Sequence, residues 1–381
     1  MIPYGRQDIT QADIDAVTDV LRSDFLTQGP QVPLFEAAIC AATGAAHAVA
    51  VNSATSALHI ACLAFDLGPG DLLWTSPNTF VATANVAHLC GADVDFVDID
   101  PETFNMCPLA LAAKLAAAQA AGRLPKVITP VHMCGQSCDM AAIGALAQRY
   151  GVRVIEDASH AIGGRYHDHP VGACEYSDIC VFSFHPVKIV TTAEGGAATT
   201  NDPLLAARMA RLRSHGITRD PDLMTHDSDG GWYYQQLELG LNYRLTELQA
   251  ALGLAQMQRL GAFVARRNAL ADRYDRLLAD LPLQRPGRLA GVLSSFHLYV
   301  IRVAAERRRA VFDHLRANGI MVNVHYIPVH TQPYWRQHGF APGDFPASET
   351  YYAQAISIPL YAGLTDAQQD TVVATLTEAL G

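Results

Sequence analysis

The sequence predicts an α/β protein with a large, mainly parallel sheet domain and a smaller α+β domain after it. Short apolar segments alternate with alanine-rich helical segments, a pattern typical of a parallel sheet that helices cover on both faces. The length of 381 residues exceeds one typical domain, so we expect two, at residues 1–245 and 246–381. Half of the residues are hydrophobic and 17% are charged, which indicates a compact globular chain.

The N-terminal segment is expected to be helical. Residues 10–13 form a capping-box pattern, and apolar residues follow at the spacing of one helix face, at Ile14, Val17, Val20 and Leu21. A turn at 26–30 precedes a second predicted helix at 33–42, which ends near Gly44. These helices come before the first strand of the sheet.

The large domain is predicted to contain seven strands and four helices between them. The strands are expected at 48–51, 72–75, 93–97, 127–131, 152–155, 177–184 and 196–200. The helices are expected at 56–67, 82–90, 109–121 and 140–150, and another begins at Pro203. Ligands of such sheets bind beyond the carboxyl ends of the strands, so polar residues there are candidates for a site.

The C-terminal part follows a polar segment at 216–237, which predicts a mobile loop, either a lid or a plain connection. After it we expect a long helix from Thr246 to about Leu281, a strand at 297–303, a helix at 306–318 ended by Gly319, and a strand at 322–327.

One lysine stands in an apolar segment shortly after a predicted strand. Lys188 lies between Val187 and Ile189, so we expect it to be at least partly buried. Burial lowers the pKa of a lysine and frees its amine as a nucleophile. The peptide alone also fits an ordinary lysine that reaches the surface from a strand end.

Three other segments favour the nucleophilic lysine over the ordinary one. Residues 52–57 follow a strand and open a helix, where backbone N–H groups and hydroxyls bind phosphate. Asp157 ends another strand and can hold a proton on a pyridine nitrogen, and Phe80 offers a flat aromatic face. Each alone fits a helix cap or a core residue. Together with Lys188 they supply what pyridoxal phosphate (PLP) requires.

Five motifs resemble those of the DegT/DnrJ/EryC1/StrS family of PLP-dependent sugar aminotransferases. They lie at 52–58 (NSATSAL), 156–161 (EDASHA), 182–185 (FSFH), 191–196 (TTAEGG) and 242–245 (NYRL). The similarity runs from the N-terminus to about Leu360. It implies the PLP-dependent transferase fold type I, which is similar to aspartate aminotransferase.

The resemblance implies a role for each residue around the cofactor ring. Lys188 would bind the cofactor covalently and move the proton in the reaction. Asp157 would pair with the ring nitrogen, and Phe80 would stack on the ring. His160 would bond the phenolic oxygen, although a lone histidine there also fits a satisfied core residue.

The resemblance also implies how the phosphate is held. Ser183, Ala54 and Thr55 would bind it, the last two mainly through backbone amides. Asn242 matches the family position that reaches the phosphate of the neighbouring subunit's cofactor. We therefore expect a homodimer with shared active sites.

Further motifs are most similar to the branch of the family that serves pseudaminic acid synthesis. They lie at 26–29, 213–216, 297–299 and 324–330. This branch moves an amino group from L-glutamate to C4 of UDP-2-acetamido-2,6-dideoxy-β-L-arabino-hex-4-ulose, giving UDP-4-amino-4,6-dideoxy-N-acetyl-β-L-altrosamine. The residues implied to contact this UDP-linked 4-keto-6-deoxy sugar are Thr27, Gln28, Arg244, His325 and Tyr326, and His330 falls in the same motif. His215 has no role that we can derive.

Other functions stay open at this stage. A relative acting on a dTDP-, GDP- or C5-epimeric UDP-4-ketose would carry the same motifs. A PLP-dependent dehydratase of the family would have histidine in place of Lys188. A non-catalytic regulator on this fold would have lost Lys188 or Asp157, or gained a DNA-binding segment.

Composition argues against several partners. The net charge of −10 is spread without long runs, so we expect no nucleic acid partner. The sequence shows neither a leader nor a long apolar segment, and its eight cysteines lack regular spacing. We therefore expect a soluble, cytoplasmic protein without a membrane partner. The histidines and cysteines lack metal-site spacing and there is no G-x-G-x-x-G motif, which argues against a metal site and a nicotinamide cofactor.

Overall fold

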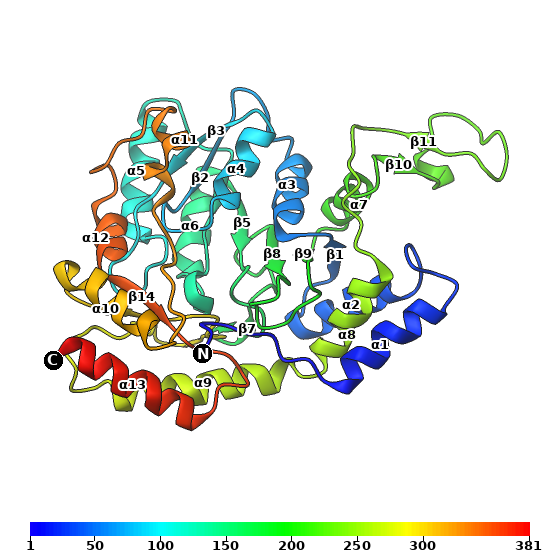
Figure 1. The fold of residues 1–381 in the computed structure, drawn as a ribbon. Coiled ribbons are helices and arrows are strands. Elements are labelled where there is room, and N and C mark those ends of the chain that lie inside the picture. The colour runs from blue at the N-terminus through cyan, green and yellow to red at the C-terminus, as the bar shows by residue number, and fades with distance from the viewer.

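The computed structural model describes residues 1–381 and contains a central sheet of seven strands (Figure 1). The strand order is β1-β9-β8-β5-β4-β2-β3. The bounds are β1 His47–Val51, β2 Leu72–Thr75, β3 Asp93–Phe96, β4 Val127–Thr129, β5 Arg153–Asp157, β8 Ile179–Ser183 and β9 Gly196–Thr200. Only β9 runs antiparallel to its neighbours, β1 and β8. The predicted seven strands and mainly parallel sheet are confirmed.

Helices pack on both faces of this sheet. The helices of the N-terminal part, of which all but α1 contribute to these layers, are α1 Gln11–Arg22, α2 Gln31–Thr43, α3 Ala54–Ala64, α4 Ala82–Leu89, α5 Pro108–Ala120, α6 Met140–Tyr150 and α7 Pro203–Leu212. The predicted capping box opens α1, because Asp13 accepts hydrogen bonds from the backbone N–H and the hydroxyl of Thr10. Gly44, at a φ of 78°, ends α2.

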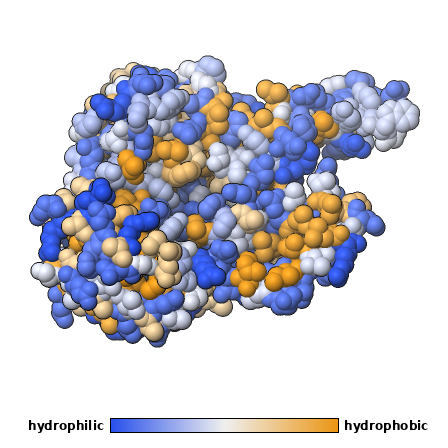
Figure 2. Space-filling model, in the orientation of Figure 1, coloured by the Kyte–Doolittle hydropathy of each residue, from blue (hydrophilic) through white to orange (hydrophobic).

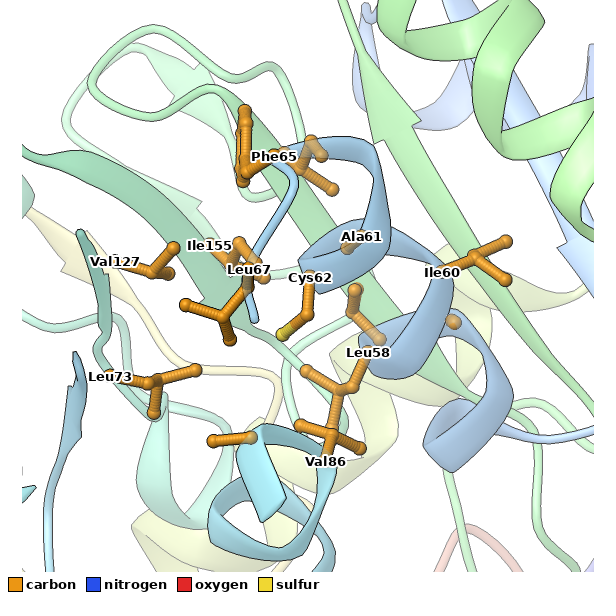
Figure 3. Close-up of a cluster of buried hydrophobic side chains, with 14 of the residues drawn as sticks. Leu58, Ile60, Ala61, Cys62, Phe65, Leu67, Leu73, Val86, Val127 and Ile155 are labelled. Carbon is orange, nitrogen blue, oxygen red and sulfur yellow. The ribbon is translucent and has the colours of Figure 1, made fainter. Parts of the chain in front are cut away.

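Alternate residues of β2, β4 and β5 pack into two different layers. In Figure 3, Leu73, Val127 and Ile155 point from β2, β4 and β5 toward α3 and α4. Their neighbours Trp74, Ile128 and Val154 belong to the layer under α5 and α6. Each fully buried aliphatic side chain stabilises the fold by about 1.5–3 kcal/mol. This double burial explains why the strands read as continuous apolar segments.

The C-terminal part forms a second core. Its helices are α8 Glu247–Met257, α9 Leu260–Leu277, α10 Ala305–Ala317, α11 Pro333–Arg336, α12 Pro346–Gln354 and α13 Asp366–Leu380. Its strands β13 Tyr299–Arg302 and β14 Ala355–Ile358 pair antiparallel, and α9 and α13 lie side by side in Figure 1. Ile2 packs into this core. In contrast, α8 packs on α1 and α2. The division into 1–245 and 246–381 remains a proposal.

Two small sheets and three short helices complete the fold. One sheet joins β6 Arg165–Tyr166, β7 His169–Pro170 and β12 Val292–Leu293, and the other pairs β10 Ile217–Thr218 with β11 Gln235–Gln236. The 3-10 helices are Met133–Gly135, Pro221–Leu223 and Val329–Thr331. The segment predicted as a loop at 216–237 therefore contains a strand pair, and it projects from the body as an arm (Figure 1). No helix has both the length and the apolar character needed to cross a membrane.

Two predicted elements are wrong. The long helix from Thr246 to Leu281 is broken between α8 and α9, where Arg259 leaves helical geometry and forms ion pairs with Asp8 and Asp13. The predicted strand at 322–327 makes only a single bridge, from Asn323 to Ser357. Asn323 exchanges two backbone hydrogen bonds with Ser357 of β14, and beyond it side chains satisfy the backbone: Asn78 accepts from the Tyr326 N–H at 3.3 Å, and Tyr351 donates to the His325 carbonyl at 2.7 Å.

Candidate active site

A cavity of about 580 Å³ lies where the carboxyl ends of β2, β5 and β8 meet the C-terminal part of the chain. Nine of the predicted site residues line it together: Ala54, Thr55, Phe80, Asp157, His160, Ser183, Lys188, His325 and Tyr326. They come from segments far apart in the sequence, and the sheet brings them to one edge.

Lys188 follows β8 in a turn in which its N–H donates to the His185 carbonyl at 2.9 Å. The side chain is half-buried and lines the cavity, as the apolar flanking residues predict. Burial lowers the pKa of Lys188 to about 8, and the negative charge of Asp157 opposes this shift only in part. About a tenth of its amine is therefore unprotonated at pH 7, and about half at pH 8.

Asp157 is the last residue of β5 and is 4% exposed. One carboxylate oxygen, Oδ1, accepts hydrogen bonds from the N–H of Ser159 at 3.1 Å and from its hydroxyl at 2.6 Å. The other, Oδ2, accepts from the hydroxyl of Thr83 at 2.7 Å. Three donors hold the carboxylate in one orientation beside the cavity.

Three buried histidines surround the lysine. The rings of His160 and His297 lie 4.4 Å apart, and the Nδ1 atom of each has no hydrogen-bond partner. Nε2 of His160 lies 3.1 Å from the hydroxyl of Tyr326. Burial and the charge of Lys188 lower the pKa of His160 and His297 well below the ordinary value, and that of His325 to about 3. All three are neutral at physiological pH.

The start of α3 forms an anion cradle. Ser53 caps the helix and accepts from the N–H of Ser56 at 3.1 Å. Ala54 and Thr55 belong to the first turn, so their N–H groups have no partner within the helix. Gly196, at the start of β9, lies against this turn: a Cβ atom there would be 2.5 Å from the nitrogen of Ala54. Ser183 pairs with Gly196 across the two strands. A helix start with free N–H groups and a hydroxyl beside it is suited to a phosphate.

These groups fit PLP. The cavity offers an anion cradle, a lysine with a lowered pKa and a fixed carboxylate, and Phe80 stands at its edge, 58% exposed, with its ring centroid 6.0 Å from that of Tyr326. His160 also lines the cavity, with Nε2 3.1 Å from the Tyr326 hydroxyl. The fold and the cavity together define a PLP-dependent transferase.

The comparisons identify the family. Residues 7–377 match the DegT/DnrJ/EryC1/StrS aminotransferase family, and the chain belongs to it. The spore coat polysaccharide biosynthesis protein SpsC of Bacillus subtilis (strain 168) is 39% identical over 379 residues, which cover 98% of this chain and 95% of SpsC.

Solved structures of sugar aminotransferases support the same family assignment. Spr1654 of Streptococcus pneumoniae in its PMP form has a TM-score of 0.92 at 30% identity and covers 100% of this chain and 99% of its own. PseC of Helicobacter pylori, an aminotransferase involved in pseudoaminic acid biosynthesis, has a TM-score of 0.90 at 31% identity with the same coverage. The predicted family, fold type, cofactor and enzyme class are confirmed: the chain is a PLP-dependent sugar aminotransferase.

Four predicted residues lie outside the cavity. Gln28 and Arg244 line a second, smaller cavity of about 230 Å³ together with Glu36 and Arg213. Thr27 lines neither cavity, and Asn242 is exposed in the segment that bridges to Ser214. His330, from the same motif as His325, is buried away from the cavity, where it bonds Glu349 at 2.9 Å.

Sequence reasoning missed several lining residues, among them Tyr4, Thr83 and Ser159. A local signal was available for two of them. Ser159 follows Asp157 at the spacing of an Asx turn, and Thr83 follows Thr79 by four residues, which places both hydroxyls on one side of a helical turn. Tyr4 had none, because it reaches the cavity through a long-range contact of the N-terminal segment with the C-terminal core.

Proposed function

We propose that this aminotransferase moves an amino group from L-glutamate to C4 of UDP-2-acetamido-2,6-dideoxy-β-L-arabino-hex-4-ulose. The product is UDP-4-amino-4,6-dideoxy-N-acetyl-β-L-altrosamine, a precursor of pseudaminic acid. The observation that carries the aminotransferase chemistry is Lys188, whose amine faces the cavity and has a pKa of about 8. The similarity to PseC and the motif at 324–330 support the sugar.

In this proposal each side chain around the cofactor ring has its own role in the reaction. PLP supplies an electron sink for the bond electrons released at the substrate carbon. The Lys188 Nζ atom holds the cofactor and later moves the proton at that carbon. The negative charge of the Asp157 carboxylate keeps the ring nitrogen protonated, and three donors hold this carboxylate in place. The neutral rings of His160 and His325 add no positive charge that would oppose a cation at Lys188.

The phosphate and ring have their own contacts in this proposal. Ala54, Thr55 and Ser183 bind the phosphate, and Phe80 covers the ring at the mouth of the cavity. His325 and Tyr326 then border the sugar, since they line the wall formed by the C-terminal part.

We propose that a second copy of the chain completes the site. Asn242, Gln28 and Arg244 lie outside the cavity around Lys188 of their own chain, which supports a role for them in the cavity of a neighbouring copy. Apolar side chains gather on the surface around α1, below the projecting arm (Figure 2). They include Ile14, Leu21, Phe25, Leu26 and Leu34, each at least half exposed. An apolar surface of this kind is typical of a protein interface.

The alternative is a different nucleotide-linked 4-keto-6-deoxy sugar. The relative that is 39% identical is named for spore coat polysaccharide rather than for pseudaminic acid. The family dehydratases are disfavoured, because Lys188 is present. A cytoplasmic location, where the sugar nucleotide is made, is part of the same proposal and agrees with eight free cysteines.

A single-turnover measurement separates the sugars. The enzyme is converted to its pyridoxamine phosphate form with L-glutamate, and UDP-linked 4-keto-6-deoxy-N-acetylhexosamines of either C5 configuration are added. We expect the absorbance of the pyridoxal form to return with the β-L-arabino ketose. Return with only the C5 epimer would move the enzyme to another sugar pathway, and no return with either would reject both sugars while leaving the aminotransferase class intact.

A further inference from the structure

Two buried threonine hydroxyls connect the loop that carries Phe80 to Asp157. Thr79 Oγ1 lies 2.8 Å from Thr83 Oγ1, which lies 2.7 Å from Asp157 Oδ2. The three residues are 2%, 1% and 4% exposed, so water cannot easily replace a lost partner. Neither threonine entered the sequence-based site.

The acceptors near the Thr83 hydroxyl decide which group donates in each of these two hydrogen bonds. The Thr83 hydroxyl has one proton and three acceptors nearby: Asp157 Oδ2, Thr79 Oγ1, and the Phe80 carbonyl at 3.2 Å. An ionised carboxylate is the strongest of these acceptors and has no proton to return. Thr83 therefore donates to Asp157, and Thr79 donates to Thr83.

We infer that Thr83 is a positioning residue, which orients the Asp157 carboxylate toward the cofactor ring and ties it to the loop of Phe80. The backbone supports the same coupling, because the Thr83 N–H donates to the Phe80 carbonyl at 3.2 Å. The Thr83 hydroxyl thus fixes Oδ2 of the carboxylate, while Ser159 holds Oδ1, and it links the carboxylate to the residue that supplies the aromatic plane. The inference rests on the proposed placement of the cofactor between Asp157 and Phe80.

The test measures PLP binding to the apo-protein. Thr83→Val keeps the shape and removes the donor, and we expect about tenfold weaker binding, since hydrogen bonds to charged groups typically contribute at least 1.4 kcal/mol. Thr83→Ser keeps the hydroxyl and is expected to stay within about threefold of the parent protein. The matched control is Thr75→Val, which removes another fully buried hydroxyl, bonded to the Thr129 carbonyl at 2.8 Å. Its PLP affinity is expected to be unchanged.

A second readout is the pH dependence of the visible absorbance of the bound cofactor. Thr83→Val is expected to shift its midpoint, whereas Thr83→Ser and Thr75→Val are not. If Thr83→Val and Thr75→Val behave alike in both measurements, the inference is overturned. Should Thr83→Val not fold, Thr79→Val tests the same pair of hydrogen bonds. About threefold weaker PLP binding supports the inference, and unchanged PLP binding overturns it.

The variant Asp157→Asn distinguishes a failure of this inference from a failure of the proposed cofactor placement. If Asp157→Asn changes neither the PLP affinity nor the absorbance, the placement itself fails. If it changes both and Thr83→Val changes neither, only the role of Thr83 is refuted.

Discussion

At the scale of single residues, the chemistry depends on one lysine and one carboxylate in the same cavity. Burial favours the neutral amine of Lys188, and the nearby Asp157 favours the ammonium. The balance leaves a pKa of about 8, low enough for a nucleophile and high enough for a proton carrier.

This balance predicts how fast the apo-protein captures PLP at different pH values. Because the nucleophile is the free amine, the rate should rise about tenfold per pH unit below the pKa of Lys188, which is about 8, and level off above it. Stopped-flow absorbance would measure it. A rate that is independent of pH between 6 and 9 would contradict the lowered pKa, and Lys188→Ala is the control without capture.

Removing the opposing charge should move the same profile. In Asp157→Asn the carboxylate no longer stabilises the ammonium, so the pKa of Lys188 should fall and the midpoint of capture should shift to lower pH. A shift to higher pH would mean that Asp157 does not act on Lys188 as a charge.

The sequence indicated these residues because each follows a strand and has a distinctive side chain. Lys188 has apolar neighbours, and Asp157 ends a buried strand, so local patterns were enough. His297 and Tyr4 could not be assigned in this way. Their place in the cavity results from packing between the C-terminal part and the sheet, which no local pattern describes.

At the scale of elements, the anion cradle depends on how closely β9 approaches the first turn of α3. Gly196 pairs with Val51 on one side and with Ser183 on the other, and its missing side chain leaves room for Ala54. The cradle therefore needs glycine for space rather than for an unusual backbone angle.

Gly196→Ala should damage both stability and cofactor binding. The added Cβ would lie 2.5 Å from a backbone nitrogen, and overpacking of this kind costs about 1–3 kcal/mol. Urea unfolding and PLP titration measure the two effects. The control is Gly261→Ala in α9, where an added Cβ meets nothing within 4 Å. This substitution should leave the free energy of unfolding unchanged or raise it by up to about 1 kcal/mol. Equal effects of the two substitutions would contradict the close approach.

Elements with regular patterns were predictable, and irregular ones were not. Strands such as β2, β4 and β5 have apolar residues on both faces, and β3 alternates Asp with Val94 and Phe96, so the strands stand out in the sequence. Residues 322–327 also contain apolar and aromatic residues, yet they pair with β14 only at Asn323, and the backbone of Tyr326 and His325 bonds to the side chains of Asn78 and Tyr351. The break between α8 and α9 likewise depends on Asp8 and Asp13, far away in the sequence.

At the scale of the whole molecule, the proposed homodimer predicts complementation between two damaged subunits. Lys188→Ala and Asn242→Ala should each have low activity, for different reasons. In a mixed dimer, one site would combine an intact Lys188 with the partner's intact Asn242. Co-refolded one to one, the pair should recover up to about a quarter of the parent activity, because half of the dimers are mixed and each has one complete site.

The control for complementation is Lys188→Ala mixed with the double variant Lys188→Ala/Asn242→Ala, which can form no complete site. Recovery no greater than the sum of the separate variants would contradict a shared site, while leaving the role of Lys188 unaffected.

The central claim is that the cavity around Lys188 is where PLP binds. The chain has only three lysines, Lys114, Lys126 and Lys188, which makes the claim unusually direct to test. PLP-loaded protein is reduced with borohydride, which fixes the cofactor to the lysine that holds it, and the labelled peptide is identified by mass spectrometry. We predict a single labelled peptide containing Lys188. Label on Lys114 or Lys126 in its place, or no label on a protein that binds PLP, would contradict the account.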